Sequence, residues 1–251
     1  MSTLCFLFLV LLSIVLLPQK YEGCQNCHTV EEPSTRAPHQ SEDVSDEDVY
    51  YFAAHSSFPG QPYDGYYGFI ATIDVYGHNI SHGQMSGSTV WVSNSDHDSA
   101  DSINSIHVGW MVSPEVYGNS HTHFYTYWTR DGLGNSGCYN MDCPGFQLEQ
   151  RSKIAPGAII RHVSEPGWSH NTMTVKVFKE KSSGNWWVYC GLNNDTPTAI
   201  GYYPANLFTS LATKADEIAF GGEASAKRSL PTPPMGSGFL PSENAASISN
   251  L

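Results

Sequence analysis

The chain has 251 residues, with 24 acidic and 12 basic side chains and a formal net charge of −12 at pH 7. This acidic balance excludes a nucleic-acid binder that relies on a basic face, so we expect no nucleic-acid partner. A hydrophobic content of 40% and an aromatic content of 12% exclude a disordered chain. The 22 Gly, 15 Pro and 14 Tyr residues are typical of strands and turns rather than long helices.

The first segment is a run of fourteen mostly apolar residues at positions 4–17. A membrane-spanning helix needs about 20 such residues, so this run is too short to be one. Pro18 ends the run, and Gly23 offers the small residue that signal peptidases require. We therefore predict a signal peptide at residues 1–23. The mature protein is expected to be secreted to the extracellular space or to a vacuole, without membrane association after signal removal.

The next segment is strongly acidic. Residues 25–48 carry seven acidic side chains against Arg36 alone, which is half of the net charge of the whole chain. The stretch also contains Pro33 and Pro38 and few large apolar residues, a composition typical of solvated tails. We predict an acidic disordered tail over residues 24–63, a folded domain over 64–240 and a flexible C-terminus over 241–251.

Cysteine usage fits an oxidising compartment once Cys5 leaves with the signal peptide. Cys138 and Cys143 flank a Gly-, Asn- and Pro-rich turn in the segment GCYNMDCPG, and they could close a small loop. The CQNC segment at residues 24–27 lies in the polar tail without the strand–helix context of a redox motif, so a terminal clip or a stray thiol is the better interpretation. Cys190 is left without an assigned partner.

Short alternating segments recur between turn signals along the rest of the chain. Alternation predicts strands at residues 69–76, 89–92, 103–112, 124–129, 173–178, 186–190 and 217–225. One helix is predicted at residues 206–217, where apolar residues follow a 3.6-residue period after Pro204. The predicted fold is all-β: an antiparallel two-sheet β-sandwich with one short helix. The sequon at Asn79 lies at a Gly-rich strand end and predicts an N-glycosylation site.

Two of the predicted strands have an apolar face and a small, polar face. In residues 103–112, His107 lies between Ser105 and Gly109 on the polar face, and in residues 217–225, Glu223 lies there between Gly221 and Ser225. Small residues beside one ionisable group leave room for a ligand to lie across a sheet. The same alternation also fits an ordinary solvated face.

Longer blocks along the chain carry a family resemblance. In order, they are GWMVSPEVYG (109–118), FYTYWTRDGLGNSGCYNMDCPGF (124–146), GNWWV (184–188), IGYYPANLF (200–208), FGGE (220–223) and MGSG (235–238). Together they resemble the neprosin family of plant secreted proteins. The resemblance implies a β-sandwich, a Cys138–Cys143 disulfide and a glutamic peptidase that cleaves on the C-terminal side of proline in acid.

In such a peptidase, one glutamate acts as general base on water, and a second, kept protonated, donates a proton. Glu223 in the FGGE block matches one member of this pair. The expected partner is a glutamate two residues before the Gly-Trp pair, and here His107 occupies that position. We expect His107 to form an ion pair with Glu223 and to lower the pKa of Glu223, which would remove the proton-sharing pair.

Two main functions follow. The first is a neprosin-like secreted glutamic endopeptidase acting on peptides or proteins rich in proline, impaired because His107 replaces a glutamate. The alternative is a catalytically inactive β-sandwich that binds peptides or cell-wall proteins, and a lectin-like module using exposed aromatic residues is a third hypothesis. No cofactor and no metal are expected, since His121 and His123 lack a third ligand at a fixed spacing. The sequence leaves catalytic competence open.

Overall fold

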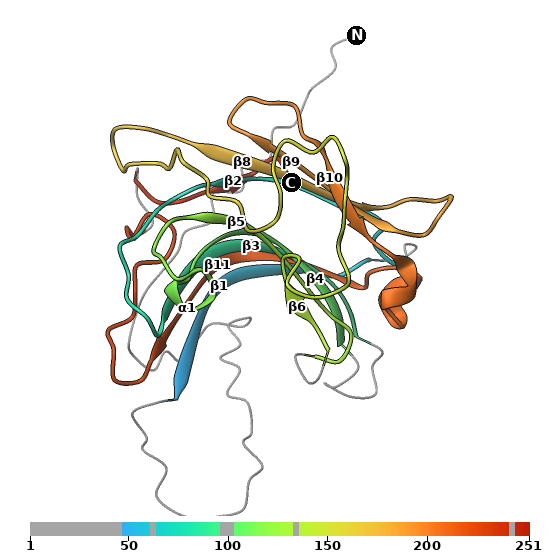
Figure 1. Cartoon of the computed structure of the whole chain (residues 1–251), viewed down its shortest axis with the longest axis horizontal. Helices are drawn as coiled ribbons and strands as arrows, with labels where there is room; N and C mark the ends of the chain where they lie inside the picture. Colours follow the sequence, from blue (N-terminus) through green and yellow to red (C-terminus); the bar gives the residue numbers. More distant parts are fainter. Residues whose placement is uncertain (1–46, 61–63, 96–102, 133–135, 241–243) are drawn as a thin grey trace, which may run out of the picture.

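The structure is a computed structural model that describes residues 47–60, 64–95, 103–132, 136–240 and 244–251. The predicted signal peptide and most of the predicted acidic tail, including Cys24 and Cys27, lie outside the described residues. The chain forms two antiparallel six-stranded sheets that pack face to face (Figure 1). This arrangement confirms the predicted two-sheet β-sandwich.

The first sheet has the strand order β1-β11-β3-β4-β5-β6, and the second has the order β12-β2-β8-β9-β10-β7. The strands of the first sheet are β1 (Asp48–Ser57), β11 (Glu217–Lys227), β3 (Gln84–Ser95), β4 (Ile103–Val112), β5 (His123–Thr129) and β6 (Cys138–Tyr139). Those of the second are β12 (Ile248–Ser249), β2 (Gly68–Asp74), β8 (Thr172–Lys179), β9 (Trp186–Leu192), β10 (Thr198–Tyr203) and β7 (Gln147–Leu148). Each segment predicted as a strand overlaps one of them. Figure 1 shows that the first sheet is bent, so that its face away from the second sheet is concave.

Alternate residues of both sheets meet in the core between them. The first sheet contributes Val90, Val92, Ile106, Val108, Trp110, Phe124, Ile218 and Phe220, and the second contributes Ala71, Ile73, Met173, Val175, Val177, Trp186, Val188 and Ile200. Complete burial of one such large side chain stabilises the fold by roughly 1.5–3 kcal/mol. Trp110 also joins the sheets directly, because its indole Nε1 donates to the carbonyl oxygen of Asp74 over 2.8 Å.

The helix predicted at residues 206–217 is wrong. The structure has two short 3₁₀ turns there, η3 (Ala205–Leu207) and η4 (Ser210–Ala212), and Glu217 already begins β11. Tertiary partners take the backbone groups that a helix would use: Asn104 Oδ1 accepts from Thr209 N over 2.7 Å, and Leu211 O accepts from Trp186 Nε1 over 2.8 Å. The α-helix in the described chain is α1 (Pro114–Tyr117), a single turn capped by Ser113. No helix among the described residues is long and apolar enough to cross a membrane.

Two segments predicted to lack structure belong to the sheets. Asp48–Ser57, within the predicted disordered tail, forms β1 and pairs with β11 along ten residues. Ile248–Ser249, within the predicted flexible C-terminus, forms β12 beside β2, and the side chain of Ile248 is buried in the core. The prediction of disorder is therefore wrong for both segments, because each one gains backbone hydrogen bonds from a neighbouring strand.

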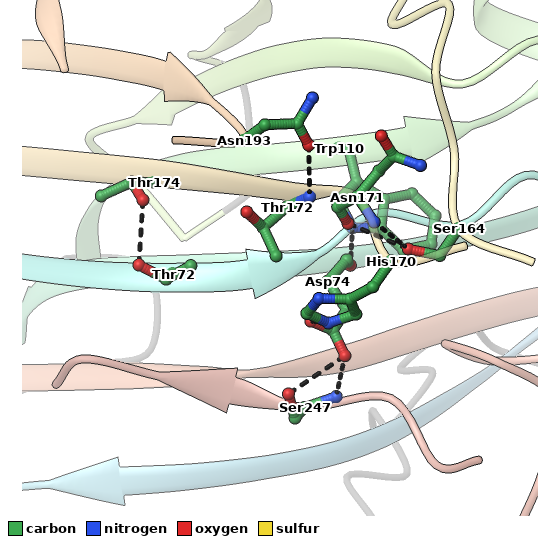
Figure 2. Close-up of polar contacts among 10 residues, drawn as sticks. All are labelled: Thr72, Asp74, Trp110, Ser164, His170, Asn171, Thr172, Thr174, Asn193 and Ser247. Atoms are coloured by element: carbon green, nitrogen blue, oxygen red, sulfur yellow. Dashed lines mark hydrogen bonds and ion pairs between the residues drawn. The ribbon is translucent and has the colours of Figure 1, made fainter. Parts of the chain in front are cut away.

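A buried carboxylate fixes the C-terminal segment to the second sheet (Figure 2). Asp74, at the end of β2, is 5% exposed. Its Oδ2 accepts from the backbone N–H of Ser247 over 2.8 Å and from the Ser247 hydroxyl over 3.0 Å. Its Oδ1 lies 2.6 Å from His170 Nε2. These contacts satisfy a carboxylate that would otherwise be costly to bury.

Candidate functional site

Glu223 lies on the concave face of the first sheet. The inward residues of β11 include Ile218 and Phe220, so alternation places Glu223 on the outer face, as predicted. Its side chain is nevertheless only 8% exposed. The absence of a side chain at Gly87, the register partner of Glu223 on β3, provides space for this carboxyl group. A Cβ at Gly87 would lie 3.4 Å from Glu223 Oε1 and 2.8 Å from Trp110 O.

Two hydroxyl groups hold the carboxyl of Glu223. Thr89 Oγ1 donates to Oε1 over 2.6 Å, and Tyr125 OH donates to the same oxygen over 2.8 Å. The two hydroxyl oxygens are themselves 2.6 Å apart, which closes a triangle of polar contacts. Tyr125 reaches this triangle from β5 across Gly109 of β4, its register partner, where the absence of a side chain leaves space for the phenol ring.

The environment of Glu223 favours the protonated carboxyl. Burial raises the pKa of Glu223 above its usual value of 4.5, and this effect outweighs the hydrogen bonds from Thr89 and Tyr125, which lower it. A carboxyl that keeps its proton in weakly acidic solution can act as a general acid. The prediction that an ion pair lowers the pKa of Glu223 is therefore wrong.

His107 lies on the same concave face, but within a different set of contacts. It pairs with Trp91 of β3 and Tyr127 of β5, and its ring centroid lies 6.2 Å and 5.1 Å from theirs. Burial lowers the pKa of His107 to about 3. In the described structure, no hydrogen bond or ion pair joins His107 to Glu223. The strand β3 separates their strands, and the register partner of His107 on β3, Trp91, lies four residues from the register partner of Glu223, Gly87. His107 is thus a neutral aromatic neighbour and not a charged partner of Glu223.

Aromatic rings continue from His107 across the whole concave face. Neighbouring ring centroids are 4.8–6.5 Å apart along the series Tyr50, Phe52, Trp91, His107, Tyr127 and Tyr139. The series starts on β1, at one edge of the first sheet, and ends on β6, at the other. We call these six residues the aromatic strip. Such a surface can bind flat or apolar groups by stacking.

The predicted disulfide is confirmed next to this strip. Cys138 and Cys143 are bonded, with Cα atoms 6.0 Å apart, and they close the loop that follows Tyr139. Cys190 is a buried free thiol in the core, and burial raises its pKa to about 12. At that pKa, Cys190 stays protonated and unreactive near neutral pH.

Other predicted site residues lie away from Glu223. Asn79 is exposed beside an open groove of about 570 Å³, where its Oδ1 accepts from Ser120 Oγ over 3.3 Å. His121 is exposed before β5, whereas His123 is buried at the start of β5 and contacts Gly157 O and Asn119 Oδ1, so the two imidazoles do not lie together on one strand face. Within the described ranges, no group of three or more His, Cys, Asp or Glu side chains could hold a metal ion.

The cluster in Figure 2 contains Ser247, Asp74 and His170, three residue types found in hydrolases. A serine nucleophile needs the imidazole beside its hydroxyl, with the carboxylate behind the imidazole. Here Asp74 lies between the other two and contacts both of them. This order does not activate Ser247, and the cluster serves to hold the C-terminal segment.

Sequence reasoning did not identify Thr89 and Tyr125 as partners of Glu223, or Tyr50 and Phe52 as its neighbours. A signal was present for Tyr125, because the alternation in FYTYWT places it opposite the core residue Phe124. The strand register that brings it to Glu223 could not be read from the sequence.

Two comparisons with known proteins describe what this chain is similar to. A family model described as Neprosin matches residues 82–251, which is more than half of the chain. Among solved structures, the chain is similar to one titled "Crystal structure of Scytalido-glutamic peptidase with a peptide based transition state analog". That alignment has 10% sequence identity and a TM-score of 0.36, and it covers 81% of this chain and 76% of that one.

Proposed function

Because the chain belongs to the Neprosin family, we propose that it is a secreted glutamic endopeptidase that cleaves peptides on the C-terminal side of proline in acid. The observation that carries the proposal is Glu223: a buried carboxyl with a raised pKa, held by two hydroxyls on a concave, aromatic face. The substrates would be peptides or proteins, and proline-rich ones fit best, because pyrrolidine rings pack well on aromatic side chains.

In the proposed reaction, Glu223 is the general acid and His107 the general base. A water molecule attacks the carbonyl carbon of the scissile bond, and neutral His107 accepts a proton from that water. Glu223 donates its proton to the leaving nitrogen as the C–N bond breaks, which releases a new carboxyl group and a new amine. The protons on the products and on the two side chains then re-equilibrate with solvent.

The lowered pKa of His107 supports this role in acid. An imidazole with a pKa of about 3 stays unprotonated above that pH, as an ordinary carboxylate does. The reaction would then require His107 without a proton and Glu223 with one. Activity should rise as pH increases through about 3 and fall as Glu223 loses its proton at higher pH.

Secretion and glycosylation complete the proposal. The apolar run at residues 4–17 and the small residue Gly23 support a signal peptide, and hence an extracellular or vacuolar location. Asn79 is exposed and therefore accessible for N-glycosylation in that pathway.

A second function is favoured by a specific observation. Within the described structure, no second carboxylate hydrogen-bonds to Glu223, and His107 contacts the rings of Trp91 and Tyr127. A concave aromatic face without a complete catalytic pair would make a peptide-binding module of the same fold. The two functions differ in one respect, namely whether the bound peptide is cleaved.

The test is digestion of a proline-containing peptide by the mature protein from about pH 2.5 to about pH 7, with products identified by mass spectrometry. The variants are Glu223→Gln, His107→Glu and, as a matched control on the same face of β11, Glu217→Gln. Cleavage after proline that is lost in E223Q but kept in E217Q supports the peptidase. If the parent protein does not cleave but H107E cleaves in acid, the protein is an enzyme that has lost its activity. If neither the parent nor H107E cleaves but both still bind the peptide, the result supports the binding module.

A further inference from the structure

The strand β1 lies outside the family-matched residues 82–251, yet it borders Glu223 directly. In the register of β1 and β11, Phe52 is opposite Glu223 and Tyr50 is opposite Ser225. Residues opposite each other in a sheet project to the same face. The side chains of Tyr50 and Phe52 therefore stand beside the candidate acid on the concave face.

These two rings are far more exposed than is usual for aromatic side chains. Tyr50 is 58% exposed and Phe52 is 54% exposed, whereas Glu223 beside them is 8% exposed. The two ring planes are within 10° of parallel, with centroids 6.5 Å apart, and Phe52 also meets the edge of Trp91 at 6.3 Å. An ordered, solvated aromatic pair next to a candidate active site is typical of a ligand contact.

Tyr139 approaches the same place from the opposite edge of the sheet. Burial raises the pKa of Tyr139, and the neighbouring Glu223, Tyr127 and Tyr50 raise it further. The ring centroid of Tyr139 lies 6.3 Å from that of Tyr125, whose hydroxyl donates to Glu223 over 2.8 Å, so Tyr139 lies close to the candidate acid on the β6 side. Phe52 is thus next to Glu223 on β1, and Tyr139 approaches it through Tyr125 from the other edge strand of the bent sheet (Figure 1).

We propose that Tyr50, Phe52 and Tyr139 form a substrate subsite that binds a flat, uncharged side chain of the peptide next to the bond cleaved at Glu223. The inference rests on the proposed function, since it assigns the residues that select the substrate. Rings on two sides favour stacking with proline or aromatic side chains.

A charged side chain would be rejected at this subsite. The titratable groups on this face are Glu223, His107, Tyr125, Tyr127 and the two tyrosines of the subsite itself. Asp48, two residues from Tyr50 along β1, is on the same face and is paired with Lys227 over 3.4 Å. Burial raises the pKa of Glu223 and lowers that of His107, so both side chains favour their neutral forms, and the charges of Asp48 and Lys227 pair with each other. A charge that loses its hydration there gains no partner in return.

The test separates binding from cleavage by using the full-length E223Q protein as background. The probes are two peptides that share one proline and differ only in the neighbouring residue, which is tyrosine in one and aspartate in the other. Affinities are measured by isothermal titration calorimetry for E223Q alone and with added Tyr50→Ala/Phe52→Ala or Tyr139→Ala. Tyr51→Ala is the matched control, because Tyr51 is 39% exposed on the opposite face of the same strand.

We expect E223Q to prefer the tyrosine peptide by about tenfold, and both subsite variants to lose this preference while Y51A keeps it. Circular dichroism and thermal unfolding establish that β1 remains folded in each variant. Equal affinity for both peptides in the unaltered subsite, or a preference that survives in Y50A/F52A and Y139A, would overturn the proposal.

Failure of the subsite and failure of the peptidase give different results. If the parent protein cleaves after proline but Y50A/F52A has an unchanged KM ratio for the two peptides, the subsite assignment is wrong and the peptidase stands. If the preference for the tyrosine peptide is present but neither the parent protein nor any variant cleaves, the subsite assignment stands and the proposed peptidase activity is wrong. If the subsite acts only in binding, Y50A/F52A will raise KM for the tyrosine peptide and leave kcat nearly unchanged.

Discussion

The hydroxyl of Tyr125 on β5 reaches the carboxyl of Glu223 on β11 over 2.8 Å, although β4 and β3 lie between these strands. This hydrogen bond, with that of Thr89, sets the orientation of Oε1 from two sides. The candidate acid on β11 is thus held by residues from two other strands, β3 and β5, so its geometry depends on the packing of the sheet rather than on a local loop.

Removal of the Tyr125 hydroxyl should raise the pKa of Glu223 further. Its hydrogen bond lowers that pKa, and burial, which raises it, remains in Tyr125→Phe. We expect the alkaline limit of activity to move to higher pH and the free energy of unfolding to fall by about 1 kcal/mol. The measurements are pH–rate profiles and urea unfolding. Tyr127→Phe, on the same face of the same strand, is the control, and an alkaline limit that moves to lower pH in Y125F would contradict the expectation.

The raised pKa of Glu223 also predicts how stability changes with pH. The folded protein holds this proton more tightly than the unfolded chain, so the contribution of Glu223 to stability is complete below about pH 4.5 and is lost as pH rises through the folded pKa. Glu223→Gln removes the penalty of burying the charge. The free-energy gain of E223Q over the parent should therefore grow with pH, by about 1.4 kcal/mol for each pH unit between the unfolded and folded pKa values.

Unfolding of parent, E223Q and E217Q at a series of pH values tests this expectation. Glu217 lies on the same strand and face, so E217Q corrects for the change in net charge. A constant difference between E223Q and the parent across the series would mean that Glu223 ionises as an exposed carboxyl does.

His107 should have the opposite effect on stability in acid. Its pKa falls from 6.5 to about 3 on folding, so the unfolded chain binds its proton first as pH decreases. The folded state should lose stability between these two values, with a slope of at most about 1.4 kcal/mol per pH unit. His107→Gln should flatten this slope, whereas His121→Gln, at an exposed position, should not. Parallel slopes for H107Q and the parent would show that His107 is solvated.

Loss of the Cys138–Cys143 disulfide should loosen the edge that carries Tyr139. The bond closes a loop with a sequence separation of 5, and cross-links in such short loops stabilise by about 2 kcal/mol in the chain-entropy model. We expect Cys138→Ser/Cys143→Ser to unfold at correspondingly lower denaturant concentration. A reductant should destabilise the parent by the same amount and leave the double variant unchanged, since the remaining described cysteine, Cys190, is a free thiol. A reductant effect that persists in the double variant would assign the stabilisation to another bond.

The carboxylate of Asp74 should control the C-terminal segment. Asp74→Asn weakens the acceptor for the N–H and hydroxyl of Ser247, and we expect a loss of about 1–3 kcal/mol. Amide hydrogen exchange of residues 244–251 should be faster in D74N than in the parent protein. Thr174→Ala is a suitable control, because it removes the Thr72–Thr174 hydrogen bond, also shown in Figure 2, from β8, which pairs with β2 and β9 and not with β12. Equal protection of residues 244–251 in D74N and T174A would show that Asp74 does not hold the C-terminal segment.

Alternation in the sequence predicted the two-sheet architecture and most of the long strands with their faces, but it did not identify β1, β6, β7, β10 or β12. It placed Glu223 opposite Ile218 and Phe220 correctly, because a period of two residues fixes the face whatever the neighbouring strand is. The same reasoning failed at residues 206–217, where apolar spacing suits a helix. Asn104 and Trp186, both distant in sequence, bind the backbone there and override the local preference.

The partners of Glu223 could not be predicted in this way. Tyr125 reaches it only because of the register of four strands and the missing side chain at Gly109. The strand β1 was assigned to the disordered tail because acidic residues precede it, although Tyr50 and Phe52 alternate with Tyr51 and Ala53. Its stability comes from pairing with β11, and long-range pairing leaves no local signature.

The position of β2 between β12 and β8 in the second sheet limits how this protein can be shortened. A recombinant fragment that begins at residue 82, where the family match begins, would lack β1 and β2. It would lose Ala71 and Ile73 from the core, and β12 would have no strand to pair with. Such a fragment should be insoluble alone and should recover its fold when residues 47–81 are supplied as a separate peptide, which makes the molecule a natural candidate for fragment complementation.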